Sequence, residues 1–330
     1  MSNPEAKPAE VVCESAVAGG VEIMTPRDVP LGGPRAMRVR RTLPQRQRSL
    51  IGAWCFVDHY GPDEVAASGG MSVAPHPHTG LQTVSWLFAG EIEHRDSAGH
   101  QALVRPGELN LMTGGRGVSH SEVSTSGTTT LHGVQLWVAL PDAARDDPAD
   151  FEHYVPAPLA APGWEARVFL GSALGDTSPV RTATPLLGIE LLLEPGTVLD
   201  LEVDETFEHG VLLDSGSLVV GDQQVKPAEL AYVEPGRTSL RLEALEASRL
   251  VVLGGPPFGE EIVMWWNFVG RTHEEVVQAR EEWQAQITRD GAVATDGQDV
   301  ADGRFGVVVG EHLPPVPAPA LPTARLKPRR

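Results

Sequence analysis

The stretch PHPHTGLQTVSWLF, residues 75–88, contains the pattern on which the fold depends. In its second half, Val84, Trp86 and Phe88 occupy every second position. Successive side chains of a β-strand point to opposite faces, so this spacing predicts a strand with one firmly buried face. The fold class then depends on whether the same pattern continues along the chain.

The rest of the sequence is typical of short strands joined by turns. Glycine and proline occur 35 and 28 times among 330 residues, above average usage, and sustained helical patterns are few. Further short apolar runs are bounded by turn residues, as in RPGELNLM and HGVQLWVALP. The predicted class is therefore all-β, and the length is sufficient for two cores.

The expected organisation is two β-barrels with one helix near the end. PG turns ahead of short strands recur in both halves, which suggests a duplicated barrel. Thr272 and Glu275 form a capping-box pair at the start of RTHEEVVQAREEWQAQI, which has an amphipathic helical pattern. The predicted segments are a flexible N-terminus (1–20), a first barrel (21–141), a linker (142–164), a second barrel with the helix (165–290) and a flexible tail (291–330).

Charge and cysteine content exclude several function classes. The formal net charge of -18 would repel phosphate backbones, so no direct nucleic-acid binding is expected. The basic cluster at 35–48 is interpreted as a source of local ion pairs. Two cysteines, Cys13 and Cys55, suit a reducing compartment and provide no disulfide framework. Without a signal-peptide pattern or a long apolar span, we expect a cytoplasmic protein that does not insert into membranes.

Four residues of metal-ligand type occur in two pairs. His76 and His78 in PHPH, and His120 and Glu122 in GGRGVSHSE, are each separated by one residue. Residues i and i+2 of a strand share a face, so each pair can direct two donors to one point inside a barrel. Either pair alone is as consistent with a surface or polar-core feature as with a metal site. Together they favour a site for a borderline divalent metal such as Fe(II), Mn, Ni, Cu or Zn, and with Fe(II) such a site would keep open positions.

Other histidines carry weaker signals. His94 and Asp96 are either partners that orient a ligand or part of a solvated turn, and the sequence leaves both open. Glu208 and His209 are adjacent and would point to opposite faces of a strand, so the second barrel is expected to lack a metal. Three further histidines are interpreted as structural: His59, His100 and His132.

The chain resembles the pirin family of the cupin superfamily. The resemblance rests on PHPHTGLQTVSWLFAGEIEHRDSAGH, PGELNLMTGGRGVSHSE, GVQLWVALP and EEIVMWWNFVGRTHEEVVQAREEW, and it covers most of residues 51–283. It implies a bicupin, two jelly-roll barrels face to face, with iron in the N-terminal barrel alone. The ligands that it implies are His76, His78, His120 and Glu122. The general cupin pattern has a ligand glutamate where this chain has Gln82.

The resemblance also implies an activity. Some pirins act as quercetin 2,3-dioxygenases, which open a flavonol ring with O2 and release carbon monoxide. Fe(II) would bind the deprotonated 3-hydroxyl of the flavonol, and Glu122 is the candidate general base. Trp86, Phe88 and Met112 are candidates for an apolar pocket wall, with plain core packing as the competing interpretation.

Two alternatives stay open at the level of sequence. Other pirins resemble redox-sensitive partners of transcription factors or metabolic enzymes, so the chain is alternatively an iron-binding regulatory module with a protein partner. A third possibility is another metal-assisted reaction on the same scaffold, because a fold does not determine a function.

Overall fold

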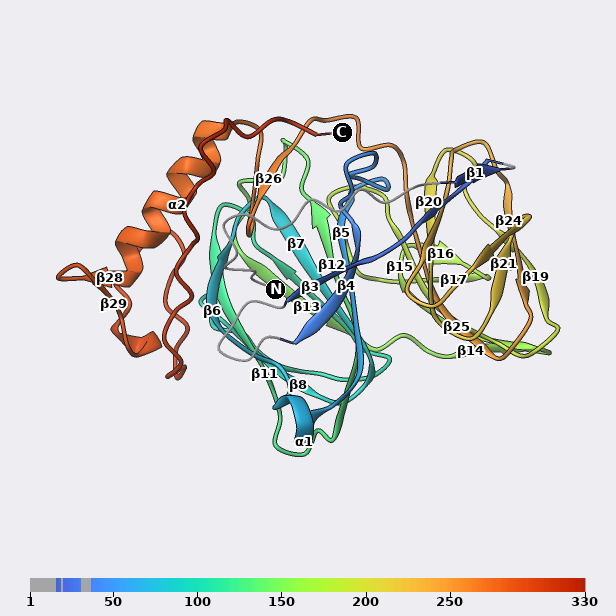
Figure 1. The fold of residues 1–330 in the computed structure, drawn as a ribbon, viewed down its shortest axis with the longest axis horizontal. Coiled ribbons are helices and arrows are strands. Elements are labelled where there is room, and N and C mark those ends of the chain that lie inside the picture. Colours follow the sequence, from blue (N-terminus) through green and yellow to red (C-terminus); the bar gives the residue numbers. More distant parts are fainter. Residues whose placement is uncertain (1–15, 19, 31–36, 330) are drawn as a thin grey trace.

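The computed structural model describes residues 16–18, 20–30 and 37–329, which form two β-barrels side by side (Figure 1). Each barrel combines one large sheet with one four-stranded sheet. The prediction of an all-β fold with one long helix is confirmed. Most of the predicted flexible N-terminus lies outside the described residues. Within the described ranges, no helix has the length and apolar character required to cross a bilayer.

The first barrel contains a seven-stranded sheet in the order β13-β10-β7-β12-β5-β4-β3 and a four-stranded sheet in the order β6-β11-β8-β9. The bounds of the larger sheet are β3 Arg27–Pro30, β4 Arg38–Leu43, β5 Trp54–Glu64, β7 Leu81–Ala89, β10 Leu109–Thr113, β12 Thr130–Ala139 and β13 Asp150–Tyr154. Those of the smaller sheet are β6 Ser72–His78, β8 Ile92–Asp96, β9 Gln101–Val104 and β11 Val118–Ser124.

The second barrel contains an eight-stranded sheet in the order β1-β2-β23-β20-β25-β18-β15-β14 and a four-stranded sheet in the order β19-β24-β21-β22. The bounds of the larger sheet are β1 Ala16–Ala18, β2 Val21–Met24, β14 Leu159–Ala161, β15 Trp164–Leu170, β18 Leu187–Leu193, β20 Glu208–Ser215, β23 Leu230–Val233 and β25 Ser248–Gly255. Those of the smaller sheet are β19 Val198–Glu202, β21 Leu218–Val220, β22 Gln223–Val225 and β24 Ser239–Ala244.

Short hairpins and helices complete the fold. The hairpins are β16 Ser172–Ala173 with β17 Asp176–Thr177, β26 Val263–Trp265 with β27 Phe268–Gly270, and β28 Thr288–Arg289 with β29 Ala292–Val293. The helices are α1 Val65–Ser68, α2 His273–Ile287 and the short 3-10 turn η1 Gly297–Asp299.

The structure differs from the predicted segment boundaries at both ends of the first barrel. β2 pairs with β23 of the second barrel, where Val21 is buried. In the predicted linker, β13 pairs with β10 and β14 pairs with β15. Both segments pair with the edge of a sheet formed by other parts of the chain, and composition alone does not predict such a pairing.

Helix α2 lies on the outer side of the first barrel (Figure 1). The Thr272 hydroxyl accepts a hydrogen bond from the Glu275 backbone N–H at 3.2 Å, which satisfies one of the unpaired donors at the helix start. Val276, Ala279 and Trp283 are buried on one face, as the pattern predicts. This face packs with Val263 and Phe268 of the β26–β27 hairpin, and the Val269 N–H of that hairpin donates to the Thr79 carbonyl at 3.0 Å, which attaches the helix to the first barrel.

The segment predicted as a flexible tail packs against this helix and the first barrel (Figure 1). Phe305 is fully buried, with its ring centroid 5.6 Å from that of Trp283. The Ser97 hydroxyl donates to the Phe305 carbonyl at 2.6 Å, and the Val316 N–H donates to the Pro75 carbonyl at 2.8 Å. The tail buries little apolar surface on itself, but the helix and barrel supply the missing partners.

Replacing Phe305 with Ala is expected to lower the free energy of unfolding by about 3–5 kcal/mol, because a buried aromatic ring leaves a cavity. The measurement is urea denaturation followed by tryptophan fluorescence. Val309→Ala is the matched control, since Val309 is 79% exposed. Equal, small effects of the two substitutions would contradict a packed tail.

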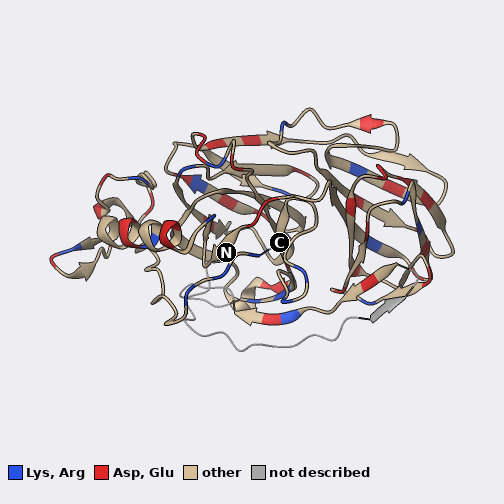
Figure 2. Cartoon of the chain, turned by 90° about the horizontal axis from the view of Figure 1, so that it is seen from above, with Lys and Arg blue, Asp and Glu red and all other residues tan. Residues whose placement is uncertain are grey.

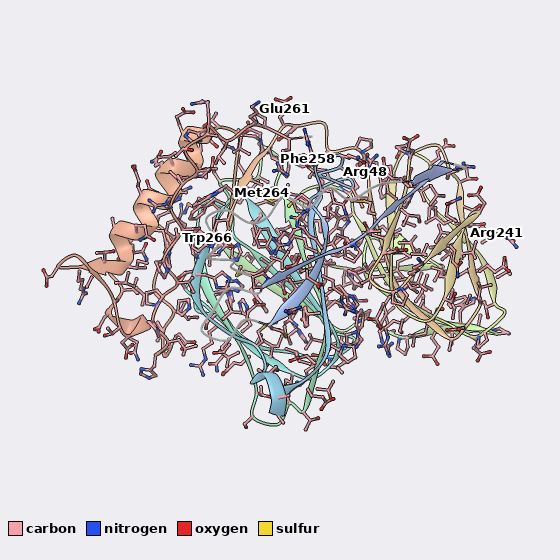
Figure 3. All side chains as sticks on the ribbon, viewed as in Figure 1. Arg48, Arg241, Phe258, Glu261, Met264 and Trp266 are labelled. Atoms are coloured by element: carbon pink, nitrogen blue, oxygen red, sulfur yellow. The ribbon has the colours of Figure 1, made fainter. Side chains whose placement is uncertain are left out.

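The two barrels share an apolar core where their large sheets meet. Trp86 of β7 stacks on Phe169 of β15 with ring centroids 4.5 Å apart. Near this junction the Arg48 guanidinium lies 3.3 Å from the Tyr232 ring centroid (Figure 3). The buried face of β7 predicted from alternation therefore packs between barrels.

Acidic and basic residues are scattered over both barrels (Figure 2). Within the basic cluster at 35–48, Arg41 pairs with Asp58 at 2.7 Å and Arg48 pairs with Glu22 at 3.1 Å. These contacts agree with the interpretation of that cluster as a source of local ion pairs.

Candidate metal centre

Strand pairing brings the two predicted ligand pairs together inside the first barrel. β11 runs antiparallel to β6, with His120 opposite His76 and Val118 opposite His78. Nε2 of His78 and Nε2 of His120 are 3.1 Å apart. Ligand atoms of His76, His78 and His120 all lie within 4.8 Å of one another, and the three side chains are fully buried. Three imidazoles therefore converge on one point.

The protonation of these imidazoles suits a metal. His76 Nδ1–H donates to the Ala74 carbonyl at 2.9 Å, which leaves Nε2 as an electron-pair donor. Among the described residues, that buried Nε2 has no hydrogen-bond partner. Burial lowers the pKa of His76, His78 and His120 well below its usual value, so all three are neutral near pH 7. This donor set fits a borderline divalent metal.

Glu122 joins the site through His120. The ladder between β11 and β6 shifts register between these two residues. A carboxylate oxygen of Glu122 forms a second group, again within 4.8 Å, with His120 and His94. Its Oε1 is 3.4 Å from the Ser85 hydroxyl, and its buried Oε2 has no partner among the described residues. The four predicted residues thus form two groups that share His120.

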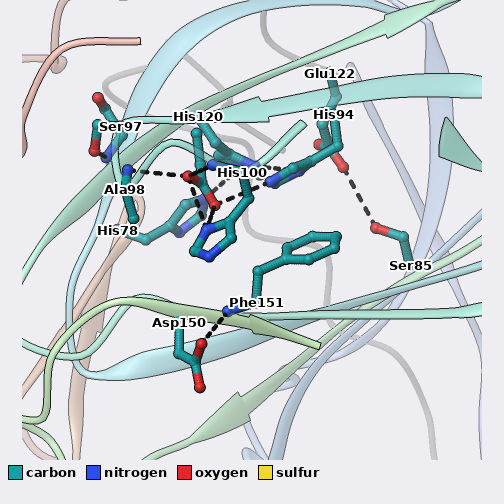
Figure 4. A network of polar contacts seen from close by, with 12 residues as sticks. His78, Ser85, His94, Ser97, Ala98, His100, His120, Glu122, Asp150 and Phe151 are labelled. Carbon is teal, nitrogen blue, oxygen red and sulfur yellow. Dashed lines mark hydrogen bonds and ion pairs between the residues drawn. The ribbon is translucent and has the colours of Figure 1, made fainter. Parts of the chain in front are cut away.

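A chain of polar contacts continues from His120 through His94 to Asp96 (Figure 4). His94 Nδ1 lies 3.3 Å from His120 Nδ1, and His94 Nε2 lies 3.4 Å from Asp96 Oδ2. Burial raises the pKa of Asp96, but hydrogen bonds from His94 and His100 outweigh it and hold that pKa below its usual value. His94 and Asp96 are buried and hold a candidate ligand; they do not form a solvated turn.

Two aromatic side chains that the sequence analysis did not select lie beside these histidines. Trp137 meets His78 edge-on at 5.2 Å between ring centroids. Phe151 stacks on His94 at 4.8 Å between ring centroids (Figure 4). Phe151 lies within residues 142–164, the segment predicted to be a linker. The period-2 alternation of GVQLWVALP was the available signal for Trp137.

Three other residues considered in the sequence make their contacts outside the four candidate ligands. Trp86 belongs to the core between the barrels, which agrees with its packing interpretation. Phe88 contacts His132, with ring centroids 5.0 Å apart. The Gln82 amide donates to the Thr113 hydroxyl at 2.9 Å, so position 82 is used for strand packing.

Two family models match the chain, one described as Pirin over residues 36–138 and one described as Pirin C-terminal cupin domain over residues 188–288. The chain belongs to the pirin family. A Pseudomonas aeruginosa protein, provisionally named a quercetin 2,3-dioxygenase, is 40% identical over 91% of this chain and 90% of its own length. A pirin-like protein of Caulobacter vibrioides is 37% identical over 75% of this chain and 88% of its own length.

Among solved structures, a quercetin 2,3-dioxygenase from Acinetobacter baumannii superimposes with a TM-score of 0.83 at 35% identity. The match covers 93% of this chain and 97% of that one. The prediction of two cupin barrels is therefore confirmed for this pirin.

A second buried cluster lies between the barrels of this pirin. His59 Nε2 and His132 Nε2 are each 2.6 Å from Asp214 Oδ1, and the Arg249 guanidinium is 3.6 Å from Asp214 Oδ2. Both histidines had been interpreted as structural. Asp214 comes from the second barrel, 155 residues from His59, so no local sequence pattern could connect them.

His209 is buried in the second barrel, and neither ring nitrogen has a hydrogen-bond partner among the described residues. Burial lowers its pKa from 6.5 to about 4. Between these pKa values the unfolded chain binds a proton that the folded protein excludes, so stability falls as the pH drops from about 6.5 towards 4. We expect the free energy of unfolding to fall between pH 7 and pH 4.5 by about 2–3 kcal/mol less in His209→Leu than in wild type.

The measurement compares urea denaturation of wild type and His209→Leu at pH 7 and pH 4.5. His312→Leu is the control, because that histidine side chain is 73% exposed. An unchanged pH dependence in His209→Leu would show that this histidine is not held neutral.

Proposed function

We propose that this pirin is a metal-dependent dioxygenase acting on flavonol-type substrates, with Fe(II) held by His76, His78, His120 and Glu122. The proposal rests on the convergence of three buried, neutral imidazoles beside a carboxylate, one oxygen of which has no hydrogen-bond partner among the residues that the structure describes. The names of the relative from Pseudomonas aeruginosa and of the structure from Acinetobacter baumannii support the substrate class.

An iron ion in this donor set would supply a Lewis acid for the substrate hydroxyl and open positions for small molecules. Glu122 Oε2 accepts the proton of the flavonol 3-hydroxyl, because no donor in the described part of the chain bonds this buried oxygen. His94 holds His120 in orientation through Nδ1. Tyr60 stays a neutral phenol, since burial and then the nearby Glu122 raise its pKa well above the usual value.

The test is oxygen uptake and carbon monoxide release with quercetin, using tag-free protein loaded anaerobically with Fe(II). Wild type is expected to turn over. Glu122→Gln is expected to retain an oxygen donor but to lose roughly 10²–10⁴-fold in kcat, the usual contribution of a general base. No turnover by fully loaded wild type would refute the proposed activity. Full activity of Glu122→Gln would remove Glu122 from the role of base.

A further inference from the structure

Three polar side chains lie side by side on the face of the large sheet that meets Glu122. Ser85 of β7 is directly opposite Asn110 of β10 on one side and Gln135 of β12 on the other. Directly opposed residues share a face of the sheet, and Ser85 lies 3.4 Å from Glu122 Oε1. Asn110, Ser85 and Gln135, here called the amide row, are each no more than 5% exposed.

The hydrogen bonds of the amide row leave two donors unused. The Ser85 hydroxyl donates to Gln135 Oε1 at 2.9 Å, and Asn110 Oδ1 lies 3.1 Å from His153 Nδ1. With both amide oxygens engaged, the buried NH2 groups of Asn110 and Gln135 have no acceptor among the described residues. The carboxylate of Asp58, directly opposite Gln135 on β5, is held by two nitrogens of Arg41 at 2.7 and 2.8 Å.

Two further donors occupy the same interior. Tyr60 Oη and Trp137 Nε1 are buried without a hydrogen-bond partner in the described part of the chain. Trp137 contacts His78, with ring centroids 5.2 Å apart. A buried donor without an acceptor costs about 1–3 kcal/mol, and each such group calls for an explanation. A group of unmatched donors beside the candidate ligands is complementary to a guest that carries acceptors.

We propose that the NH2 groups of Asn110 and Gln135 bind carbonyl or phenolate oxygens of the substrate, opposite the candidate metal ligands. The inference rests on the proposed function and specifies its substrate as a planar aromatic with several oxygen acceptors. Ser85 positions the Gln135 amide by holding its Oε1, which directs the NH2 group away from the hydroxyl. Hydrocarbon aromatics lacking such oxygens leave these donors unpaired and are rejected.

The test is anaerobic quercetin binding, followed by absorbance, to Fe(II)-loaded and metal-free protein. Gln135→Met and Asn110→Leu replace each amide by an apolar group of similar size. Each is expected to raise the Kd of quercetin about tenfold, the loss of one hydrogen bond, with metal content unchanged. Each substitution also removes the amide oxygen that bonds Ser85 or His153, so a small fall in the melting temperature of the ligand-free protein is expected, and the Kd is measured well below that temperature.

Gln82→Met is the matched control, since Gln82 is a buried amide on β7, the strand that carries Ser85, and its NH2 group is bonded to Thr113. Its Kd for quercetin is expected to equal that of wild type.

Three outcomes would overturn the inference: an unchanged Kd in both amide-row variants, an equal rise of the Kd in Gln82→Met, or no quercetin binding by wild type. Tight binding without oxygen consumption would refute the dioxygenase alone. Normal turnover with unchanged Kd in the variants would refute the amide row alone.

Discussion

Replacing His120 with Ala is expected to remove bound metal from the protein. His120 belongs to both donor groups, one with His76 and His78 and one with His94 and Glu122. Its loss separates the carboxylate from the other two imidazoles. Loss of a residue that only supports a ligand costs 10–100-fold in affinity, so we expect at least a roughly hundredfold weaker metal Kd for this direct donor. Plasma mass spectrometry of tag-free protein, loaded anaerobically with Fe(II), measures the metal content of each variant.

Two comparisons sharpen this result. His76→Ala and Glu122→Ala test the remaining ligands, whereas His153→Ala is the control, because that histidine side chain is 41% exposed and bonded to Asn110. Near-stoichiometric metal in wild type and His153→Ala, with little in the ligand variants, is the expected pattern. Full metal in His120→Ala, or none in loaded wild type, would overturn the ligand assignment.

Replacing Asp214 with Ala is expected to lower the apparent free energy of unfolding by about 3–5 kcal/mol, the usual cost of breaking a buried charge network. The carboxylate accepts hydrogen bonds from His59 and His132 across the two barrels, with Arg249 beside it. Its removal leaves two imidazoles and a cation without their shared acceptor. Guanidinium denaturation followed by tryptophan fluorescence measures the change.

The stabilisation by the Asp214 carboxylate depends on pH in a definite direction. Burial raises the pKa of Asp214, but the hydrogen bonds from His132 and His59 outweigh it and depress that pKa. The stabilisation is therefore present above the unfolded carboxyl pKa near 4 and is lost as the pH falls below it. Asp222→Ala, at an exposed carboxylate, is the control. A loss below about 1 kcal/mol in Asp214→Ala would show that the cluster does not hold the barrels together.

Much of the candidate site was predictable because its information is local. The i and i+2 spacing of His76 with His78 places both on one face of β6. Helix α2 was predictable for a similar reason, since its cap and its buried face depend on neighbouring residues. The period of the side chains is a property of the backbone, and it holds wherever the strand or helix is placed.

The boundaries were less predictable because they depend on surfaces that form elsewhere. β13 and the C-terminal segment have weak patterns, and they order by pairing with β10 and by burying Phe305 against Trp283. Composition measures what a segment can bury on itself and gives no account of a preformed sheet edge or helix face.

The sequence by itself determined the all-β class, the long helix and the four candidate ligands, because each depends on spacing within a few residues. Only the tertiary structure decided the contact of His94 with His120, the amide row beside Glu122 and the cluster that joins His59 to Asp214. Those contacts arise from strand register and from the docking of two barrels. The low-dielectric interior that results is what keeps the histidines neutral and makes each unpaired donor significant.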